Sequence, residues 1–217
     1  MIRVICILIG YCFGLIQTAF IYGKIKGIDI RNYGSGNAGT TNVMRTLGKK
    51  AGIITYLGDC LKAVCCTIAI HFIFGKTHTD MEFLLALYGG LGVVLGHNFP
   101  FYMGFKGGKG IAATSGFILS LIPYNWLIVL IAAIAFFGTM FITRYVSFAS
   151  LFFVTVVLIE IVIFGQLEYF AMPQSYCYEA YAVTLVVVVM AFVRHKENIK
   201  RLLNGTERKI FQKKENN

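Results

Sequence analysis

Seven apolar stretches, separated by shorter polar segments, constrain the fold of this chain more than any other feature. A bilayer core about 30 Å thick needs about 20 apolar residues in each helix that crosses it. The chain is 57% hydrophobic and 14% charged, whereas soluble domains carry about 25% charged residues. The stretches cover residues 2–23, 53–74, 83–101, 111–123, 126–143, 147–165 and 178–193. The sequence therefore predicts an all-α, polytopic integral membrane protein with about seven transmembrane helices, the fourth being short.

Positive charge falls in alternate connections between these stretches. Seven crossings place the basic segments 24–50, 102–110 and 194–217 on one side, together with Arg144. The opposite side carries only two cations, Arg3 and Lys76, beside three acidic residues, Asp80, Glu82 and Glu168. Because cytoplasmic loops carry an excess of Lys and Arg, we expect the N-terminus outside and the C-terminus in the cytoplasm. The net charge of +10 is better explained in this way than by nucleic-acid binding.

Two charges interrupt the second apolar stretch. Asp59 and Lys62 are three residues apart, so they share one face of a helix. Charged groups in a membrane are costly and are usually paired. The spacing predicts either a structural ion pair or a pair with a role near a functional site.

The first basic segment is rich in groups that bind anions. Gly34, Gly36 and Gly39 match G-x-G-x-x-G, but a membrane helix precedes them where a dinucleotide fold needs a strand. Glycines still let backbone N–H groups approach an anion. Further side-chain donors are Ser35, Asn37, Thr40, Thr41 and Asn42, and Arg45 follows on an expected helix. The segment predicts a phosphate site; the alternative is a flexible polar loop with helix caps.

The second basic segment lacks a nucleotide-binding motif. Gly108 and Lys109 would need Gly at position 103 and Ser or Thr at position 110 for a Walker A sequence, but Met103 and Gly110 stand there. ATP is therefore not indicated. Residues 106–110 instead predict a small anion cradle at the start of the next helix. His97, at the end of the third stretch, fits a packed side chain as well as a functional one.

Two shorter segments complete the polar side. Arg144 and Ser147 flank a short turn that an ordinary interfacial cap also explains. In the tail, His195 and Asn198 are three residues apart and share a helical face directly after the last membrane helix. They are placed to point back at the loops, although a basic tail attracted to lipid is the simpler alternative.

Together these motifs resemble the acyl-phosphate:glycerol-3-phosphate acyltransferases. The matching segments are 34–42 with Arg45, 96–110 and 194–207, and 144–147 looks like the family's shorter middle motif. The resemblance covers nearly the full chain. It implies one membrane-embedded acyltransferase domain over residues 1–217, in a bacterial cytoplasmic (inner) membrane with the active site on the cytoplasmic side.

Two positions depart from the family pattern. Asp59-x-x-Lys62 fits the pattern, but Ala63 stands where the family usually has Gly, and Met103 replaces a more usual Leu. Neither departure touches an expected catalytic group.

The resemblance implies a reaction and roles for residues. The family transfers an acyl chain from acyl phosphate to the 1-hydroxyl of glycerol 3-phosphate, so we expect these substrates and membrane lipid as partners, without cofactor, metal, ATP or nucleic acid.

The resemblance also implies roles for individual residues. Catalytic roles fall to Ser35, Asn37, Lys106 and His195. Acyl-phosphate binding falls to Gly36, Gly39, Thr40, Thr41, Asn42 and Ser147. Glycerol 3-phosphate binding falls to Arg45, Lys106, His195 and Asn198. Loop support falls to His97, Gly107, Gly108, Lys109, Gly110 and Glu207.

The base that takes the hydroxyl proton is left open by the sequence. The His-x-x-x-x-Asp motif of other glycerolipid acyltransferases is absent, because none of the four histidines is followed by Asp at that spacing. His195 is one candidate base, and the acceptor's own phosphate, whose second pKa is near 6, is the other. The main rival function is a transporter for an anionic metabolite, whose site would be expected near the bilayer midplane.

Overall fold

The computed structural model describes residues 1–210, and all regular secondary structure within them is helical. Residues 211–217, the end of the expected domain 1–217 and of the basic tail, lie outside the described residues. The α-helices are α1 (Ile2–Gly14), α2 (Thr18–Ile25), α3 (Thr40–Leu47), α4 (Lys49–Ile70), α5 (Glu82–Asn98), α6 (Ile111–Leu119), α7 (Trp126–Thr143), α8 (Val146–Gln166), α9 (Gln174–Arg194) and α10 (Lys196–Leu203). Short 3₁₀ turns occupy Ile30–Asn32, Thr79–Met81 and Phe101–Met103, and a π turn, His71–Gly75, extends α4.

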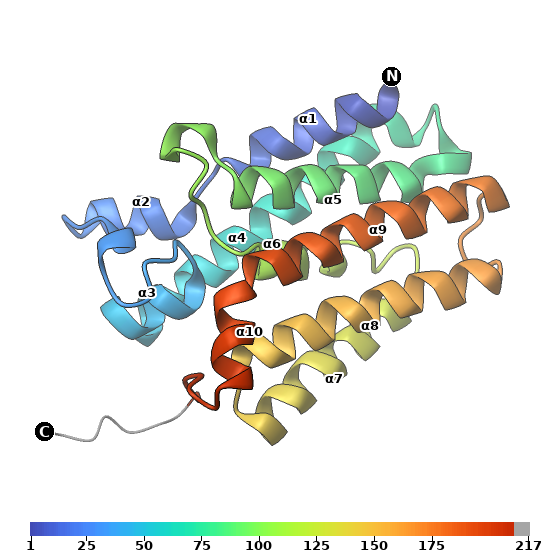
Figure 1. Cartoon of the computed structure of the whole chain (residues 1–217). Coiled ribbons are helices and arrows are strands. Elements are labelled where there is room, and N and C mark those ends of the chain that lie inside the picture. The colour runs from blue at the N-terminus through green and yellow to red at the C-terminus, as the bar shows by residue number, and fades with distance from the viewer. Residues whose placement is uncertain (211–217) are drawn as a thin grey trace, which may run out of the picture.

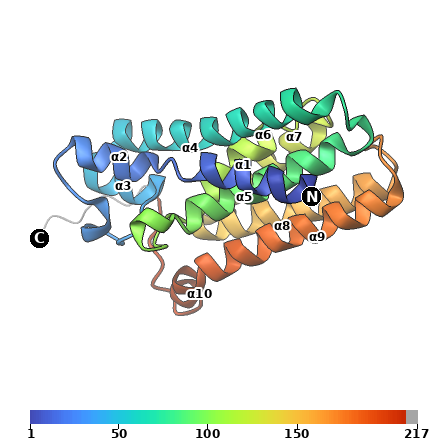
Figure 2. The same ribbon diagram turned by 90° about the horizontal axis from the view of Figure 1, so that it is seen from above.

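The long helices lie side by side in one bundle (Figures 1 and 2). Six segments of the described chain are long and apolar enough to cross a membrane: Ile2–Ile25, Lys49–Gly75, Thr79–Met103, Trp126–Thr143, Val146–Gln166 and Gln174–Arg194. The segment around α5 is the most enclosed of them, and that around α7 lies at the periphery. The prediction of a polytopic all-α architecture agrees with this arrangement.

The fourth apolar stretch, 111–123, is short as the sequence predicts, and it does not form a full membrane-spanning helix. Helix α6 has nine residues, which span about 14 Å and fall short of a bilayer core. Turns then carry the chain on to the start of α7. Ser120 Oγ donates to Thr67 Oγ1 at 2.8 Å, and Tyr124 OH donates to Glu82 Oε1 at 2.8 Å, so these turns reach the end of the bundle where α5 begins. The chain thus makes this fourth passage without a full-length helix.

The first apolar stretch is also divided, between α1 and α2. Gln17, fully buried at the break, donates from Nε2 to the carbonyl oxygens of Gly14, Gly96 and His97 at 3.0–3.3 Å. A buried amide needs such partners, and carbonyls freed by the break need donors. The break therefore fixes the end of α1 against the end of α5.

Glycines allow α1 and α5 to touch along their length. A Cβ on Gly92 would lie 2.2 Å from the carbonyl oxygen of Ile7, and one on Gly96 would lie 2.3 Å from that of Tyr11. Small residues at helix contacts let backbones approach and gain packing energy in membranes, where lipid is as apolar as the protein interior. This contact holds α5, and hence the loop after it, in place.

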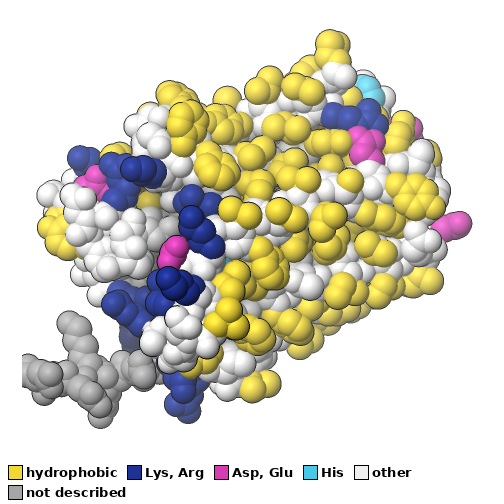
Figure 3. All heavy atoms as spheres, in the orientation of Figure 1, with side chains coloured by type: hydrophobic (Ala, Val, Ile, Leu, Met, Phe, Trp, Pro, Cys, Tyr) yellow, Lys and Arg dark blue, Asp and Glu magenta, His cyan; other side chains and the backbone are white. Residues whose placement is uncertain are grey.

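The two ends of the bundle differ in charge. Figure 3 shows apolar side chains over the helices and a concentration of Lys and Arg at the end where the loops and α10 lie. The N-terminus lies at the other end (Figure 1). There Arg3 Nη2 donates to Glu179 Oε2 at 2.7 Å. The two ends thus have the asymmetry that the sequence predicts, whereas their orientation in a membrane stays a prediction.

We predict that Gly92→Ala destabilises the protein by about 2 kcal/mol, because the added methyl group has no room against α1. Thermal unfolding in detergent measures the change. Gly138→Ala is the matched control, since a Cβ on this glycine of α7 meets nothing within 4 Å. Equal unfolding temperatures for the two variants would contradict the tight α1–α5 contact.

Candidate functional site

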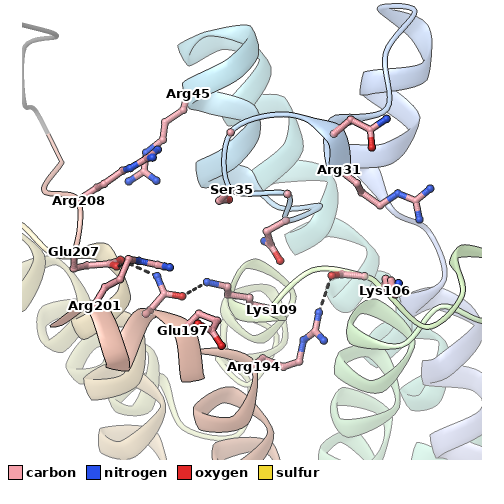
Figure 4. A pocket seen from close by; sticks show the side chains of 16 residues that line it. Arg31, Ser35, Arg45, Lys106, Lys109, Arg194, Glu197, Arg201, Glu207 and Arg208 are labelled. Carbon is pink, nitrogen blue, oxygen red and sulfur yellow. Dashed lines mark hydrogen bonds and ion pairs between the residues drawn. The ribbon is translucent and has the colours of Figure 1, made fainter. Parts of the chain in front are cut away.

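A polar pocket opens at the basic end of the bundle (Figure 4). It consists of two adjoining hollows of about 690 and 170 Å³. Their walls come from the first basic segment (the first loop), the second basic segment (the second loop) and the tail, and helices also line the smaller hollow. The expected site residues at these walls are Ser35, Gly36, Asn37, Gly39, Thr40, Thr41, Asn42, Arg45, His97, Lys106, Gly107, Lys109, Gly110, Ser147, His195, Asn198 and Glu207. Segments up to about 170 residues apart in the sequence therefore meet at one place. The roles expected for the individual residues remain predictions.

The first loop is shaped by Asn42. Its Oδ1 accepts from the Ser35 N–H at 2.8 Å, and its Nδ2 donates to the carbonyls of Ile30 and Tyr33 at 3.1 and 2.9 Å. Gly34, beside it, has a φ of +62° that favours glycine. We expected Asn42 to bind acyl phosphate, but its amide hydrogens are both used by the backbone, so its place is that of a loop support.

The start of α3 remains open toward the smaller hollow. The backbone N–H groups of Thr40 and Thr41 have no backbone acceptor among the described residues. Thr40 Oγ1 is buried and has no partner within residues 1–210. The unpaired N–H groups at a helix start carry partial positive charge, which suits an anion. Ser35 and Asn37 border the same hollow.

The second loop is held from both sides. The N–H groups of Gly107 and Gly108 donate to the carbonyls of Asn98 and His97 at 3.2 and 3.1 Å. Arg194 donates to the carbonyls of both glycines at 2.8–3.1 Å. The expected anion cradle at 106–110 is therefore corrected in part: the N–H groups of Gly107 and Gly108 are occupied, whereas those of Lys109 and Gly110 have no backbone acceptor among the described residues. The side chains of Lys106 and Lys109 also border the larger hollow.

The tail folds back through Glu207. Its Oε1 accepts from Ser147 Oγ at 2.9 Å and from Asn198 Nδ2 at 2.7 Å, and its Oε2 accepts from Arg201 Nε at 2.7 Å. Burial alone would raise the pKa of Glu207, but hydrogen bonds from these groups outweigh it and lower that pKa. Lys109 Nζ in turn donates to Asn198 Oδ1. Glu207 thus joins α8, α10 and, through Asn198, the second loop.

His195 is neutral and oriented. Its Nδ1 lies 2.8 Å from the Ala191 carbonyl, which can only accept, so Nδ1 carries the proton and Nε2 carries the lone pair. Burial, followed by the charge of Lys109, lowers the pKa of His195 to about 4. The imidazole is therefore uncharged at neutral pH and can accept a hydrogen bond.

Cations outnumber anions at the larger hollow. Seven of its lining residues are Arg31, Arg45, Lys106, Lys109, Arg194, Arg201 and Arg208, against two acidic ones, Glu197 and Glu207. Burial, followed by Arg201, lowers the pKa of Lys109 to about 8. Desolvation, followed by Arg208, lowers that of Arg45. A bound polyanion would reduce this repulsion between like charges, so the charge of the pocket suits anionic ligands.

Comparison with known proteins decides the family. A family model described as glycerol-3-phosphate acyltransferase matches residues 4–205. The chain belongs to this family. Glycerol-3-phosphate acyltransferases from Alkaliphilus metalliredigens and Clostridioides difficile are 43% and 42% identical to it; each alignment covers 98% of this chain, and 98% and 97% of the respective relative.

Solved structures of the family share the fold. The crystal structure of PlsY (YgiH), an integral membrane glycerol 3-phosphate acyltransferase, in its glycerol 3-phosphate form superposes with a TM-score of 0.80. The two chains are 31% identical, with 97% of this chain and 99% of the other covered. The lysophosphatidic acid form gives a TM-score of 0.78 at the same identity, with 95% and 94% covered. The present chain is therefore an integral membrane protein of this family.

Sequence reasoning assigned no site role to several residues of the pocket. Arg194 clamps the second loop, and Arg31, Arg201 and Arg208 line the larger hollow. Arg194 and Arg201 lie in the matching segment 194–207, but beyond that the signal of these four residues in the sequence was only positive charge, which membrane orientation explains as well. Nothing in the spacing of Arg194 and Gly107, 87 positions apart, indicates their contact.

We predict that Glu207→Ala frees the chain around Arg208 and Lys209 for cleavage by trypsin. Loss of three hydrogen bonds to one carboxylate should raise the cleavage rate by a factor on the order of ten or more. Glu197→Ala is the matched control, a nearby acidic residue that also borders the hollow. Equal cleavage of the two variants would show that Glu207 does not anchor the tail.

Proposed function

We propose that this protein transfers a fatty acyl group from acyl phosphate to the 1-hydroxyl of sn-glycerol 3-phosphate. The products are 1-acyl-sn-glycerol 3-phosphate, which is lysophosphatidate, and inorganic phosphate. The observation that carries the proposal is the pocket with seven cations, because two phosphorylated ligands need more positive charge than one small anion. Family membership, and the two ligands named for the PlsY structures, support the acceptor and the product.

The smaller hollow suits the donor. The start of α3 offers the N–H groups of Thr40 and Thr41 to a phosphate, with Ser35 and Ser147 at the same hollow. Apolar side chains from four helices line its remaining wall: Tyr56, Ile111, Phe136 and Val146. An acyl phosphate has a charged head and an apolar chain, so this mixed lining matches its chemistry, with the chain directed toward the lipid-facing helices.

The larger hollow suits the acceptor. Arg45, Lys106 and Asn198 border it, and His195 borders the adjoining smaller hollow. Arginine binds phosphate through two parallel hydrogen bonds, and lysine binds it as a point charge. Together these groups would hold the phosphate of glycerol 3-phosphate and leave its 1-hydroxyl near the donor carbonyl.

The reaction needs one bond formed and one broken. The acceptor's 1-hydroxyl oxygen forms a bond to the acyl carbon, and the bond from that carbon to the donor phosphate oxygen breaks, releasing phosphate. Ser35, Asn37 and Lys106 border the larger hollow and would stabilise the developing oxyanion and the leaving phosphate. The hydroxyl proton passes to the acceptor's own phosphate, whose second pKa is near 6.

The distribution of positive charge supports a cytoplasmic position for the pocket. The pocket lies at the end of the bundle where Lys and Arg concentrate (Figure 3), which by the positive-inside rule is the cytoplasmic end in a bacterial inner membrane. Acceptor and leaving phosphate are water-soluble, and this position gives both access to the cytosol. A transporter would instead be expected to hold its substrate near the bilayer midplane.

Purified protein given palmitoyl phosphate and glycerol 3-phosphate should release inorganic phosphate and form lysophosphatidate in equal amounts. Omission of the acceptor is the control, and release should then fall to the hydrolysis background. Transport of glycerol 3-phosphate into vesicles without phosphate release would overturn the proposal in favour of the rival function.

We predict that His195→Gln raises the KM for glycerol 3-phosphate about tenfold and leaves measurable turnover, because the histidine binds the acceptor and is not the base. The pH profile of kcat/KM, which reports groups of the free enzyme and the free substrate, distinguishes the two roles. Activity should be lost as the pH falls through about 6, where the acceptor phosphate gains a proton. A limb near pH 4, the pKa of His195, that disappears in the variant would identify the imidazole as the base.

A further inference from the structure

A buried polar cluster lies beneath the two glycine-rich loops. Asp59 and Lys62 of α4 and His97 of α5 are only 1%, 4% and 2% exposed. Lys62 Nζ lies 3.0 Å from Asp59 Oδ1 and 2.8 Å from His97 Nδ1. The Asp59–Lys62 ion pair that the spacing predicts is thus present. His97 joins it, a contact that the sequence did not indicate.

Lys62 also binds the break between α1 and α2. Its Nζ donates to the carbonyls of Ile16 and Gly14 at 2.6 and 3.3 Å, two acceptors that lose their helical partners there. From the start of α2, Thr18 Oγ1 donates to Asp59 Oδ1 at 3.1 Å. The Lys62–Asp59 pair therefore connects α1, α2, α4 and α5.

The cluster borders the smaller hollow through Asp59 and His97, and it meets the second loop through His97. A Cβ on Gly108 would lie 2.1 Å from His97 Nε2 and 2.8 Å from the Ala38 carbonyl oxygen. Gly108 is therefore enclosed between the imidazole below and the first loop above. Any shift of His97 moves Gly108, and with it the contact between the donor loop and the loop that carries Lys106 and Lys109.

We infer that the Lys62–Asp59 pair, acting through His97, is a positioning element that sets the separation of residues 34–42 from residues 106–110. Lys62 lines neither hollow, whereas Asp59 and His97 border the smaller one, so Lys62 acts only through its partners. The inference rests on the proposed function, in which these loops hold the two reacting molecules. Acyl transfer depends on that spacing, because a misplacement of about 1 Å can reduce a rate about 100-fold.

A double variant separates positioning from mere charge balance. Lys62→Met alone leaves the Asp59 carboxylate buried and unpaired, which should lower the unfolding temperature and the activity together. Lys62→Met/Asp59→Asn removes both charges, and replacing a buried ion pair by neutral groups is often tolerated. If the cluster served only stability, this double variant would regain both the unfolding temperature and the activity of the wild-type protein.

We expect the double variant to recover the unfolding temperature but not the rate. Its kcat should stay about 100-fold below the wild-type value, with the KM for glycerol 3-phosphate changed less than about threefold. Arg3→Met/Glu179→Gln, which removes an ion pair at the opposite end of the bundle, is the matched control and should keep the wild-type kcat. Recovery of kcat together with stability in the double variant would overturn the inference.

A distance measurement tests the inference independently of activity. Spin labels at Tyr33→Cys and Phe105→Cys, both exposed, report the separation of the loops once the exposed Cys12 and Cys65 are replaced by serine. The distribution should shift or broaden in the double variant and stay unchanged in the control pair. Unchanged loop distances would refute the positioning role even if the wild-type protein is active.

His97→Asn provides a variant that keeps the ion pair. Its Oδ1 can still accept from Lys62, but the ring edge beneath Gly108 is gone. The loop distance should change and kcat should fall although no charge is lost; wild-type values for both would refute the link through His97. If the wild-type protein transfers no acyl group, the proposed function fails, while the distances still decide the positioning role.

Discussion

The cations around the pocket repel one another, and much of the structure at this end of the bundle serves to hold them together. Arg194 and Lys109 are held by neutral acceptors, the carbonyls of Gly107 and Gly108 and the amide of Asn198. Within residues 1–210, Glu207 is the one residue that supplies a carboxylate to the hydrogen-bonded tail network. Neutral acceptors fix the geometry of cations without cancelling their charge. The pocket therefore keeps an unbalanced positive field that phosphorylated ligands can neutralise.

Two features of the bundle make that arrangement rigid. The glycine contact between α1 and α5 brings their backbones together, and the break after α1 presents free carbonyls to Gln17 and Lys62. Polar groups inside a membrane protein need internal partners, because lipid offers none. The break and the buried charges satisfy one another, and they do so directly below Gly108. The helix break and the buried charges would each be costly in isolation, but together they support the loops of the site.

The position of the pocket reconciles an apolar substrate with a soluble one. The smaller hollow has a polar wall with Ser35 and Ser147 and an apolar wall with Tyr56 and Phe136, and the larger hollow carries most of the charge. A site at the end of the bundle can receive one molecule along the helices and the other from water. This arrangement supports interfacial acyl transfer better than passage of a solute through the bundle.

The sequence by itself determined the all-helical membrane architecture, the gathering of positive charge on alternate loops and the Asp59–Lys62 pair. These properties depend on hydrophobicity and on spacing within one helix, which are local. It also indicated most of the residues that line the pocket, because glycine-rich and cationic loops have few other uses in such number.

Only the tertiary structure determined which partners those residues contact. Asn42 was expected at a phosphate but supports the loop, Gly107 and Gly108 were expected to offer N–H groups that are already occupied, and α6 is too short to cross. The contacts of Arg194 with the second loop and of Lys62 with His97 join separate helices. Which donor satisfies which acceptor depends on how the helices pack, and a pattern within one segment carries no information about a partner supplied by another.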